Sequence, residues 1–409
     1  MTGFGLSSGF AHAEGGVVAA AGFFAAATHC GLKGDGKRDL ALISAEEAVA
    51  VAAVFTTNRV AAAPVVLSRR HVSSGHARAV IINAGNANAC TGPQGEHDAR
   101  ATAVAVAESL ACAPEEVLVC STGVIGVPLP LERIVSAIPD LVEGLDSRDG
   151  ADVAEAIMTT DTFSKQLAVS VEVDGRLVTV GGMAKGSGMI APNMATMLSV
   201  LTTDAPLTPE ACDAALRAAC DTTFNRVTVD SDTSTNDTLI LLASGAAGGE
   251  SISTEDDAYP LLAEAVRVVC AELARMIARD GEGATKLIVV TVSGAATDED
   301  ATLAAFAVAD SPLVKTALFG NDANWGRVAM AVGKSGADVD PGLLGIVFAG
   351  IEVCRGGGAV PFDEDEAFAA LDCDEVTIEV SLGLGSGEAT VLTCDLSYEY
   401  VRINGEYRS

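Results

Sequence analysis

The sequence predicts a mixed α/β protein with material for two or three domains. Its 409 residues are 49% hydrophobic, which is enough apolar surface for more than one buried core. Segments rich in β-branched residues occur along the same chain as segments with the 3.6-residue apolar spacing of helices. Strands and helices are therefore both expected.

The first 110 residues are expected to be strands joined by irregular loops. Short apolar runs lie at 41–43, 51–55 and 80–82, and turn-favouring residues separate them. This pattern predicts a sheet-rich N-terminal part.

Two helices are indicated by their ends as well as by their spacing. Thr208 precedes a Pro-Glu pair, which is a helix start, and the alanine-rich stretch after it predicts a helix through Cys220. A longer helix is expected from about Ala258 to Arg279, with Gly281 as its stop. Its apolar face is expected to lie on a sheet.

The last third predicts a small α+β domain. Four β-rich segments lie at residues 287–292, 376–382, 390–396 and 398–403. A helix is expected to open at Ser311. The glycine-rich run Gly383–Gly387 joins two of these strands and opens no helix, so it predicts a hairpin turn and not a dinucleotide site. The domain border is placed near residue 285.

Composition argues against several classes of partner. The 55 acidic residues against 25 basic ones give a net charge of −30, which repels phosphate backbones, so no nucleic acid is expected. The ten cysteines include no Cys-x-x-Cys pair and all five histidines precede residue 98, so no zinc site is expected.

Neither a membrane span nor export is expected. The apolar stretches are shorter than the roughly 20 residues of a membrane span. A cytoplasmic protein is expected, because no basic residue precedes the apolar stretch at 15–28 as it would in a signal peptide.

A calcium loop is suggested and then excluded by the run that begins at Asp230. Asp232 and Ser234 follow at the spacing of an EF-hand. Thr235 stands at the glycine position, however, and Leu241 at the position of the bidentate glutamate. No metal is expected.

The stretch 181–199, GGMAKGSGMIAPNMATMLS, is the main candidate for chemistry. It is not a phosphate-binding loop, because Lys185 precedes a Gly-Ser pair where that loop has lysine directly before the hydroxyl residue. The remaining candidate is Thr196, whose hydroxyl needs a base. Cleavage of the Ala195–Thr196 bond would supply one, the freed α-amine, with a reference pKa of roughly 8. The residues alone also allow an ordinary strand threonine.

Motifs along the whole chain carry a resemblance to a known family. They are FTTNRVAAAPV at 55–65, NAGNANACTG at 83–92, KGSGMIAPNMATML at 185–198, VDSDTSTNDT at 229–238 and FGNDANWGR at 319–327. In these motifs the chain resembles the ornithine acetyltransferases, also called bifunctional glutamate N-acetyltransferases. The family's glycine is replaced at Ser231, which does not touch the expected chemistry.

The resemblance implies a layered α-β-β-α sandwich around an N-terminal threonine, over residues 1–285, with the smaller α+β domain at 286–409. It implies self-cleavage into chains 1–195 and 196–409, assembled as two of each. The implied reaction moves acetyl from N2-acetyl-L-ornithine to L-glutamate, releasing ornithine and N-acetylglutamate, through an acetyl ester of Thr196. No cofactor is implied, although acetyl-coenzyme A is a second donor in the bifunctional members.

The resemblance also assigns site residues. Thr122 and Gly123 match the pair that forms the oxyanion hole, and N–H and hydroxyl donors suit a tetrahedral oxyanion. The substrate-binding positions that match are Thr162, Lys185, Thr196, Glu282, Asn404 and Ser409. They include both charge signs, as an amino-acid substrate requires.

Two alternatives stay open at this point. One is a self-processed aminopeptidase or amidase that passes its acyl group to water, which would need no glutamate. The other is a non-enzymatic acidic binding protein, in which the 181–199 stretch is a structural loop and the chain stays uncut.

Overall fold

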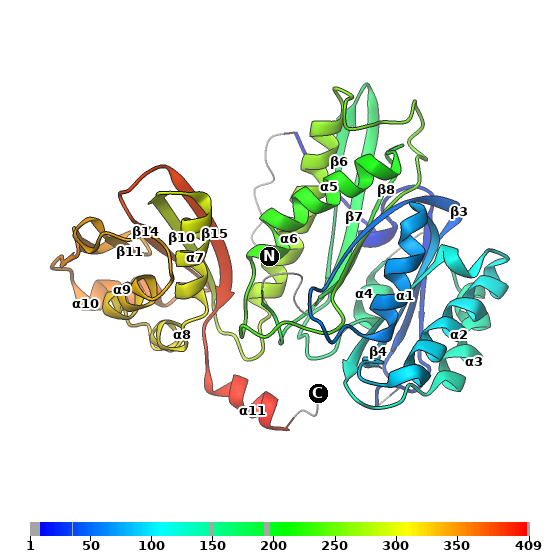
Figure 1. The fold of residues 1–409 in the computed structure, drawn as a ribbon, viewed down its shortest axis with the longest axis horizontal. Coiled ribbons are helices and arrows are strands. Elements are labelled where there is room, and N and C mark those ends of the chain that lie inside the picture. Colours follow the sequence, from blue (N-terminus) through cyan, green and yellow to red (C-terminus); the bar gives the residue numbers. More distant parts are fainter. Residues whose placement is uncertain (1–8, 35, 147–149, 192–196, 407–409) are drawn as a thin grey trace.

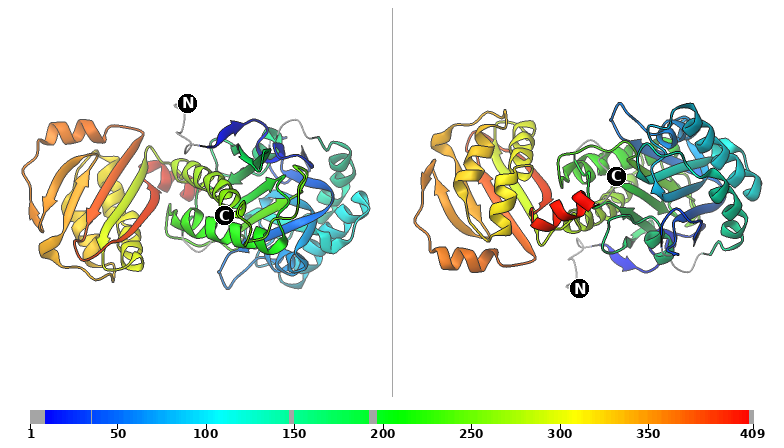
Figure 2. Two further views of the ribbon diagram at one scale, coloured as in Figure 1. Left: turned by 90° about the horizontal axis from the view of Figure 1, so that it is seen from above. Right: turned by 90° about the horizontal axis from the view of Figure 1, so that it is seen from below.

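The computed structural model describes residues 9–34, 36–146, 150–191 and 197–406 of the chain. Two sheets lie side by side along its long axis, one of nine strands and one of six (Figure 1). Figure 2 shows the same two parts from above and below, with helices beside each sheet.

The nine-stranded sheet takes its strands from the first 243 residues. They are β1 (Ala11–Ala13), β2 (Phe23–Thr28), β3 (Leu40–Phe55), β4 (His76–Asn86), β5 (Val117–Val124), β6 (Lys165–Val173), β7 (Arg176–Lys185), β8 (Leu198–Thr203) and β9 (Thr238–Ala243). The helices of this part are α1 (Ala63–His71), α2 (Gly92–Leu110), α3 (Leu131–Glu143), α4 (Ala151–Ala156), α5 (Pro209–Thr222) and α6 (Tyr259–Arg279).

Strand β3 turns this sheet into two layers. Its pairing with β4 shifts register between Ser44 and Val49, and a shift of this kind bends a strand. Before the bend β3 pairs with β2 and β4, and after it residues 50–55 pair with β9. The layer β2-β3-β4-β5 therefore faces the layer β1-β6-β7-β8-β9.

A buried core fills the space between the two layers. It takes side chains from β4 and β5, such as Ile82 and Leu118, and from β8 and β9, such as Val200 and Ile240. Helices α5 and α6 cover the outer face of one layer, and α2 and α3 cover the other. The predicted α-β-β-α sandwich is confirmed.

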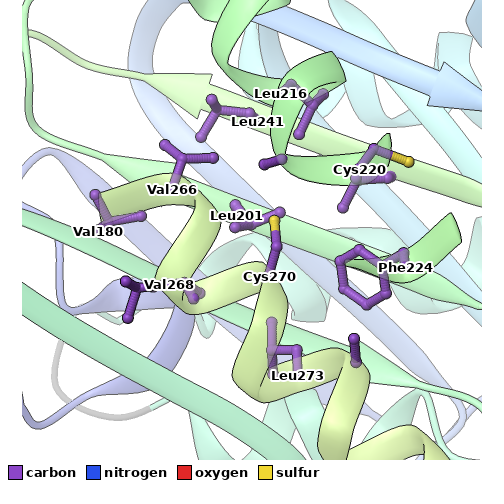
Figure 3. Close-up of a cluster of buried hydrophobic side chains, with 14 of the residues drawn as sticks. Val180, Leu201, Leu216, Cys220, Phe224, Leu241, Val266, Val268, Cys270 and Leu273 are labelled. Atoms are coloured by element: carbon purple, nitrogen blue, oxygen red, sulfur yellow. The ribbon is translucent and has the colours of Figure 1, made fainter. Parts of the chain in front are cut away.

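The core under α5 and α6 is shown in Figure 3. Leu273 and Cys270 of α6 and Cys220 of α5 point into it, next to Leu201 of β8. Burial raises the pKa of the Cys220 thiol to about 12. At neutral pH it is therefore an uncharged packing group, and no thiolate forms there.

Helices from the last third of the chain pack on one face of the six-stranded sheet. Its strands are β10 (Leu287–Ala295), β11 (Gly345–Phe348), β12 (Ile351–Arg355), β13 (Gly358–Ala359), β14 (Glu375–Ser381) and β15 (Gly387–Cys394). Its helices are α7 (Asp298–Ala309), α8 (Pro312–Phe319), α9 (Trp325–Gly333) and α10 (Glu364–Leu371), and α11 (Tyr398–Glu406) follows the sheet. Helix α6 contacts β10 and β15 as well. In β14 the buried Val376, Ile378 and Val380 alternate with outward polar residues, which is the pattern of a half-covered sheet.

The domain border expected near residue 285 stays a prediction, because Leu287 and Cys394 pack into the core of the first sheet.

The two helices predicted from their ends are confirmed. Thr208 caps α5, its side chain accepting a hydrogen bond from the Ala211 amide at 3.1 Å. Helix α6 covers the expected range, and its buried face packs on β6 and β7. Ser311 likewise caps α8.

Three expectations from the sequence are wrong. The first 110 residues contain the expected strands, but the helices α1 and α2 lie between and after them in place of irregular loops. Residues 398–403, expected as a strand, belong to α11. Gly383–Gly387 is not a hairpin turn, because β14 and β15 do not pair with each other but lie on opposite sides of β10.

No single helix in the described ranges is long and apolar enough to cross a membrane. The neighbours α7 and α8 reach the required length and composition only together, with a bend of 57° between them.

The packing of α6 on β7 predicts the effect of a core substitution. Leu273 is fully buried, whereas Leu261 on the same helix is 38% exposed. Leu273→Ala should lower the free energy of unfolding by about 2–5 kcal/mol, because it removes buried methyl groups and leaves a cavity. Leu261→Ala, the matched control, should cost less than about 1 kcal/mol. Urea unfolding measures both, and equal losses would contradict the described packing of α6.

Candidate active site

A pocket lies where the ends of β4, β5 and β7 meet the loop that precedes β9. About 610 Å³ of space, open solvent included, lies between its walls. Its wall is formed by Ala87, Thr122, Gly123, Ile125, Thr159, Thr160, Lys185, Gly188, Met189, Ser234, Thr235, Asn236, Glu282 and Asn404. Both β-layers and the C-terminal helix α11 contribute to it.

The end of β5 brings Thr122 and Gly123 to this wall. These residues pair with Ala84 and Gly85 of the parallel strand β4. Gly123 has φ 130°, and a Cβ there would lie 2.3 Å from the carbonyl carbon of Gly85. Only glycine fits at this position, so the backbone is held close to the pocket without a side chain.

The end of β7 brings Lys185 into the same wall. Lys185 is 3% exposed and lies opposite Leu198 in the β7–β8 ladder. Its Nζ donates to the Thr122 hydroxyl at a long 3.4 Å, and no carboxylate lies within ion-pair distance of it in the described parts of the chain. Burial lowers its pKa, and the charges of Asp161 and Glu282 work against that shift. A buried ammonium with so weak a partner is suited to an anionic ligand group.

Glu282 faces this cation from the loop after α6. Its backbone N–H donates to the Ser187 carbonyl at 2.9 Å, and its Oε2 accepts the Asn404 side-chain amide at 2.7 Å. A Cβ on Gly188 would lie 2.3 Å from the Glu282 carboxyl carbon. The absence of a side chain at Gly188 therefore makes the space that the carboxylate occupies.

A buried ion cluster joins the segments that carry these residues. Lys165 is 0% exposed, and its Nζ lies 2.6 Å from Asp161 and 2.5 Å from Asp280. Asp161 also accepts the N–H groups of Thr159 and Gly186, at 2.9 and 2.7 Å. The cluster thereby fixes the pocket segment at 159–160, the end of β7 and the start of the loop that holds Glu282.

The charge state of the cluster follows from its cations. Burial alone would raise the pKa of Asp161, but the ammonium groups of Lys185 and Lys165 lower it to about 2. The Asp161 carboxylate is therefore ionised through the ordinary pH range, and it keeps a negative charge beside the Lys165 ammonium.

The structure places some of the predicted site residues together and not others. Thr122, Gly123, Lys185, Glu282 and Asn404 line one pocket. Their roles stay predictions, because proximity alone does not assign them.

Other predicted residues lie away from this wall or cannot be placed. Thr162 is exposed and does not line the pocket, and its hydroxyl and N–H donate to Asp280. Ala195, Thr196 and Ser409 lie outside the described residues. Met197, covalently next to Thr196, is buried, and its N–H donates to Asp237 at 2.9 Å.

Sequence reasoning missed residues that the structure brings to the site. Asp161 and Lys165 lie on either side of Thr162 in the stretch TTDTFSK at 159–165, but nothing in this stretch indicates that the lysine is buried. Asn236 lies in VDSDTSTNDT, a motif noticed for its EF-hand spacing and its family resemblance, neither of which singles out this asparagine. In the described part of the chain, no group of three or more His, Cys, Asp or Glu could hold a metal ion.

The chain is similar to a known family over nearly its whole length. A model of the ArgJ family matches residues 24–409. The arginine biosynthesis bifunctional protein ArgJ of Symbiobacterium thermophilum is 52% identical over 397 residues, which cover 97% of this chain and 99% of that protein. The protein of the same name from Geobacter sulfurreducens is 51% identical over 389 residues, 95% of this chain and 99% of its own.

A solved structure also matches part of the chain. The crystal structure of the ArgJ protein of Bacillus halodurans is 44% identical, with a TM-score of 0.49, and covers 50% of this chain and 97% of that one.

The buried ion cluster predicts a large cost for losing its cation. Lys165→Met should destabilise the fold by about 3–5 kcal/mol, because Asp161 and Asp280 would stay buried without it. Arg217→Met is the control, since it removes an exposed ion pair with Asp213 and should cost about 0–1 kcal/mol. Thermal unfolding at neutral pH measures both, and an equally stable Lys165→Met would contradict the cluster.

Asp161 also predicts a pH dependence of stability. Its folded pKa of about 2 lies below the ordinary 3.8. The carboxylate therefore adds stability that is complete above about pH 4 and is lost as the pH falls toward 2. In Asp161→Asn the melting temperature should fall less steeply over this range than in the unaltered protein. Parallel curves would show that the fold does not lower the pKa of Asp161.

Gly188 predicts a local effect on ligand binding. Gly188→Ala should displace the Glu282 carboxylate and weaken binding of a cationic ligand group, with little loss of stability. Gly333→Ala is the control, since nothing lies within 4 Å of a Cβ there. Calorimetric binding of ornithine checks this, and unchanged affinity in Gly188→Ala would count against a role for Glu282.

Proposed function

The chain belongs to the ArgJ family, and on that premise we propose that it moves the acetyl group of N2-acetyl-L-ornithine to L-glutamate in arginine biosynthesis. The family match confirms the resemblance found in the motifs. The observation from the structure that best supports the reaction is one pocket with a buried cation, a carboxylate and the glycine end of β5. An acetylated amino acid and an amino-acid acceptor both need such opposite charges.

We propose Thr196 as the nucleophile, after cleavage of the Ala195–Thr196 bond. The hydroxyl attacks the acetyl carbonyl while the new α-amine, with a reference pKa of roughly 8, takes the hydroxyl proton. Support comes from the position of Met197, the residue after Thr196, because it directly precedes Leu198, the first residue of β8, which pairs with Lys185 of the pocket wall.

The oxyanion of the tetrahedral intermediate is proposed to lie against Thr122 and Gly123. The close approach of Gly123 to Gly85 holds this backbone rigid, and donors fixed before the reaction need no reorganisation during it. The Lys185 ammonium lies beside the Thr122 hydroxyl and adds positive potential there.

Lys185 and Glu282 are proposed to recognise the substrate, with Thr162, Asn404 and Ser409. Lys185 suits the α-carboxylate that N-acetylornithine and glutamate share, and Glu282 suits the side-chain ammonium of ornithine. Asn404 holds the Glu282 carboxylate at 2.7 Å, so α11 contributes to the site through that contact.

Three further properties are proposed on the family premise. Acetyl-coenzyme A serves as a second acetyl donor, since the relatives are named bifunctional. The cleaved halves assemble as two α and two β chains. The protein acts in the cytoplasm, where its amino-acid substrates are found.

Single-turnover kinetics test the proposed reaction. Cleaved protein given N-acetylornithine alone should release about one equivalent of ornithine per site and then stop, until glutamate restarts it. Thr196→Ala should stay uncut and release none, whereas Thr222→Ala, which changes an exposed threonine on α5, should behave as the unaltered protein. Continued ornithine release without glutamate would identify an amidase instead.

A further inference from the structure

The loop at 229–238 makes contacts with both sides of the segment that carries the expected cleavage. On the upstream side, the Asp230 carboxylate accepts the N–H groups of Met189 and Ile190, at 2.6 and 2.8 Å. On the downstream side, Oδ1 of Asp237 accepts the N–H of Met197 at 2.9 Å. Two carboxylates from one loop thus hold described residues before and after 192–196.

Backbone hydrogen bonds reinforce both contacts. The Val229 N–H donates to the Ile190 carbonyl at 2.8 Å, and the Thr238 N–H donates to the Met197 carbonyl at 3.1 Å. The N–H and the C=O of Met197 are therefore both hydrogen-bonded, one to Asp237 at the end of the loop and the other to Thr238 at the start of β9.

The loop is itself fixed to the other β-layer. The Asn236 side-chain amide donates to the carbonyls of Ala87 and Ser121, at 2.6 and 2.9 Å. The Thr56 N–H donates to the Asp237 carbonyl at 3.0 Å. Ser121 precedes Thr122, so the backbone that holds Met197 is positioned directly against the proposed oxyanion hole.

Burying the carboxyl group of Asp237 at this position costs folding free energy. The residue is 1% exposed, and its second oxygen, Oδ2, accepts no hydrogen bond of ordinary length from the described residues, although the Ser234 hydroxyl lies close enough to the carboxyl to oppose the rise of its pKa. A buried carboxyl with an unsatisfied oxygen costs folding free energy. An apolar side chain of similar volume would avoid that cost, so stability alone does not explain the carboxyl.

We propose that Asp237 is a positioning residue for self-cleavage and acetyl transfer, which acts by fixing the Met197 amide through its Oδ1. The Met197 nitrogen belongs to the peptide bond that joins it to Thr196, and this peptide is planar. Fixing that N–H therefore fixes the plane of the peptide bond on the C-terminal side of the proposed nucleophile. The inference rests on the proposed function, because it takes Thr196 as the nucleophile.

The role needs a hydrogen-bond acceptor and not a charge. Burial raises the pKa of the Asp237 carboxyl well above its ordinary value, although the Met197 amide and the Lys185 ammonium work against the shift. An asparagine keeps the acceptor oxygen without a charge. A leucine of similar volume has no acceptor.

The test follows cleavage in freshly synthesised full-length chains by intact mass against time. Asp237→Asn should cleave at nearly the unaltered rate. Asp237→Leu should cleave about 10- to 100-fold more slowly, since misplacing a reacting group by about 1 Å has an effect of that size. Its melting temperature should stay within about 4 °C, because the buried carboxyl is lost together with the bond it made. Asp232→Leu, an exposed position in the same loop, is the matched control and should cleave normally.

Acetyl transfer by the cleaved fraction gives a second readout. Asp237→Leu should lower kcat and leave KM unchanged, because Asp237 does not line the pocket. Should the leucine variant fail to fold, Asp237→Ser replaces it, since its hydroxyl is too short to reach the same amide. Normal cleavage and kcat in these variants, or an asparagine variant as slow as leucine, would overturn the inference. An unaltered protein that stays uncut would overturn the proposed nucleophile as well, which separates the two failures.

Discussion

The side-chain amide of Asn236 joins the two β-layers at the point where the pocket forms. Both of its N–H groups are used, one on the Ala87 carbonyl after β4 and one on the Ser121 carbonyl within β5. The side chain is 7% exposed, so neither bond is weakened by competition with water. The bend in β3 makes two layers out of one sheet, and this amide fixes their spacing at one edge. The distance between β5 and the start of β8 depends on it.

The electrostatics of the site are opposite to those of the whole chain. The protein carries a net charge of −30, yet the pocket wall contains the buried ammonium of Lys185, and Lys165 lies buried behind it. Asp161 and Asp280 balance Lys165 at ion-pair distance, whereas Lys185 is left to a weak hydroxyl contact. One cation is thus structural, and the other is available to a substrate. Such a division suits amino-acid substrates, whose carboxylates would otherwise be repelled by the acidic surface.

Local patterns in the sequence predicted the elements whose causes are local. The Thr208 cap and the spacing in 258–279 gave α5 and α6, because capping and apolar periodicity act within a few residues. Helix α11 was missed because its aromatic and β-branched residues favour a strand, and none of its described residues 398–406 is buried to reveal a helical face. The contact of Asn236 with Ala87 spans 149 residues, and no window along the sequence contains it. The motifs identified five residues of the pocket wall, but not the cluster or the loop that hold them.

The proposed reaction requires that Thr196 carries the acetyl group between donor and acceptor. The most direct measurement is peptide mass spectrometry of cleaved protein, quenched in acid after incubation with N-acetylornithine and without glutamate. We expect one acetyl group on the peptide that begins at Thr196, and its loss when glutamate is added before the quench. An unmodified Thr196 in protein that has released ornithine, or an acetyl group on Lys185 instead, would contradict it.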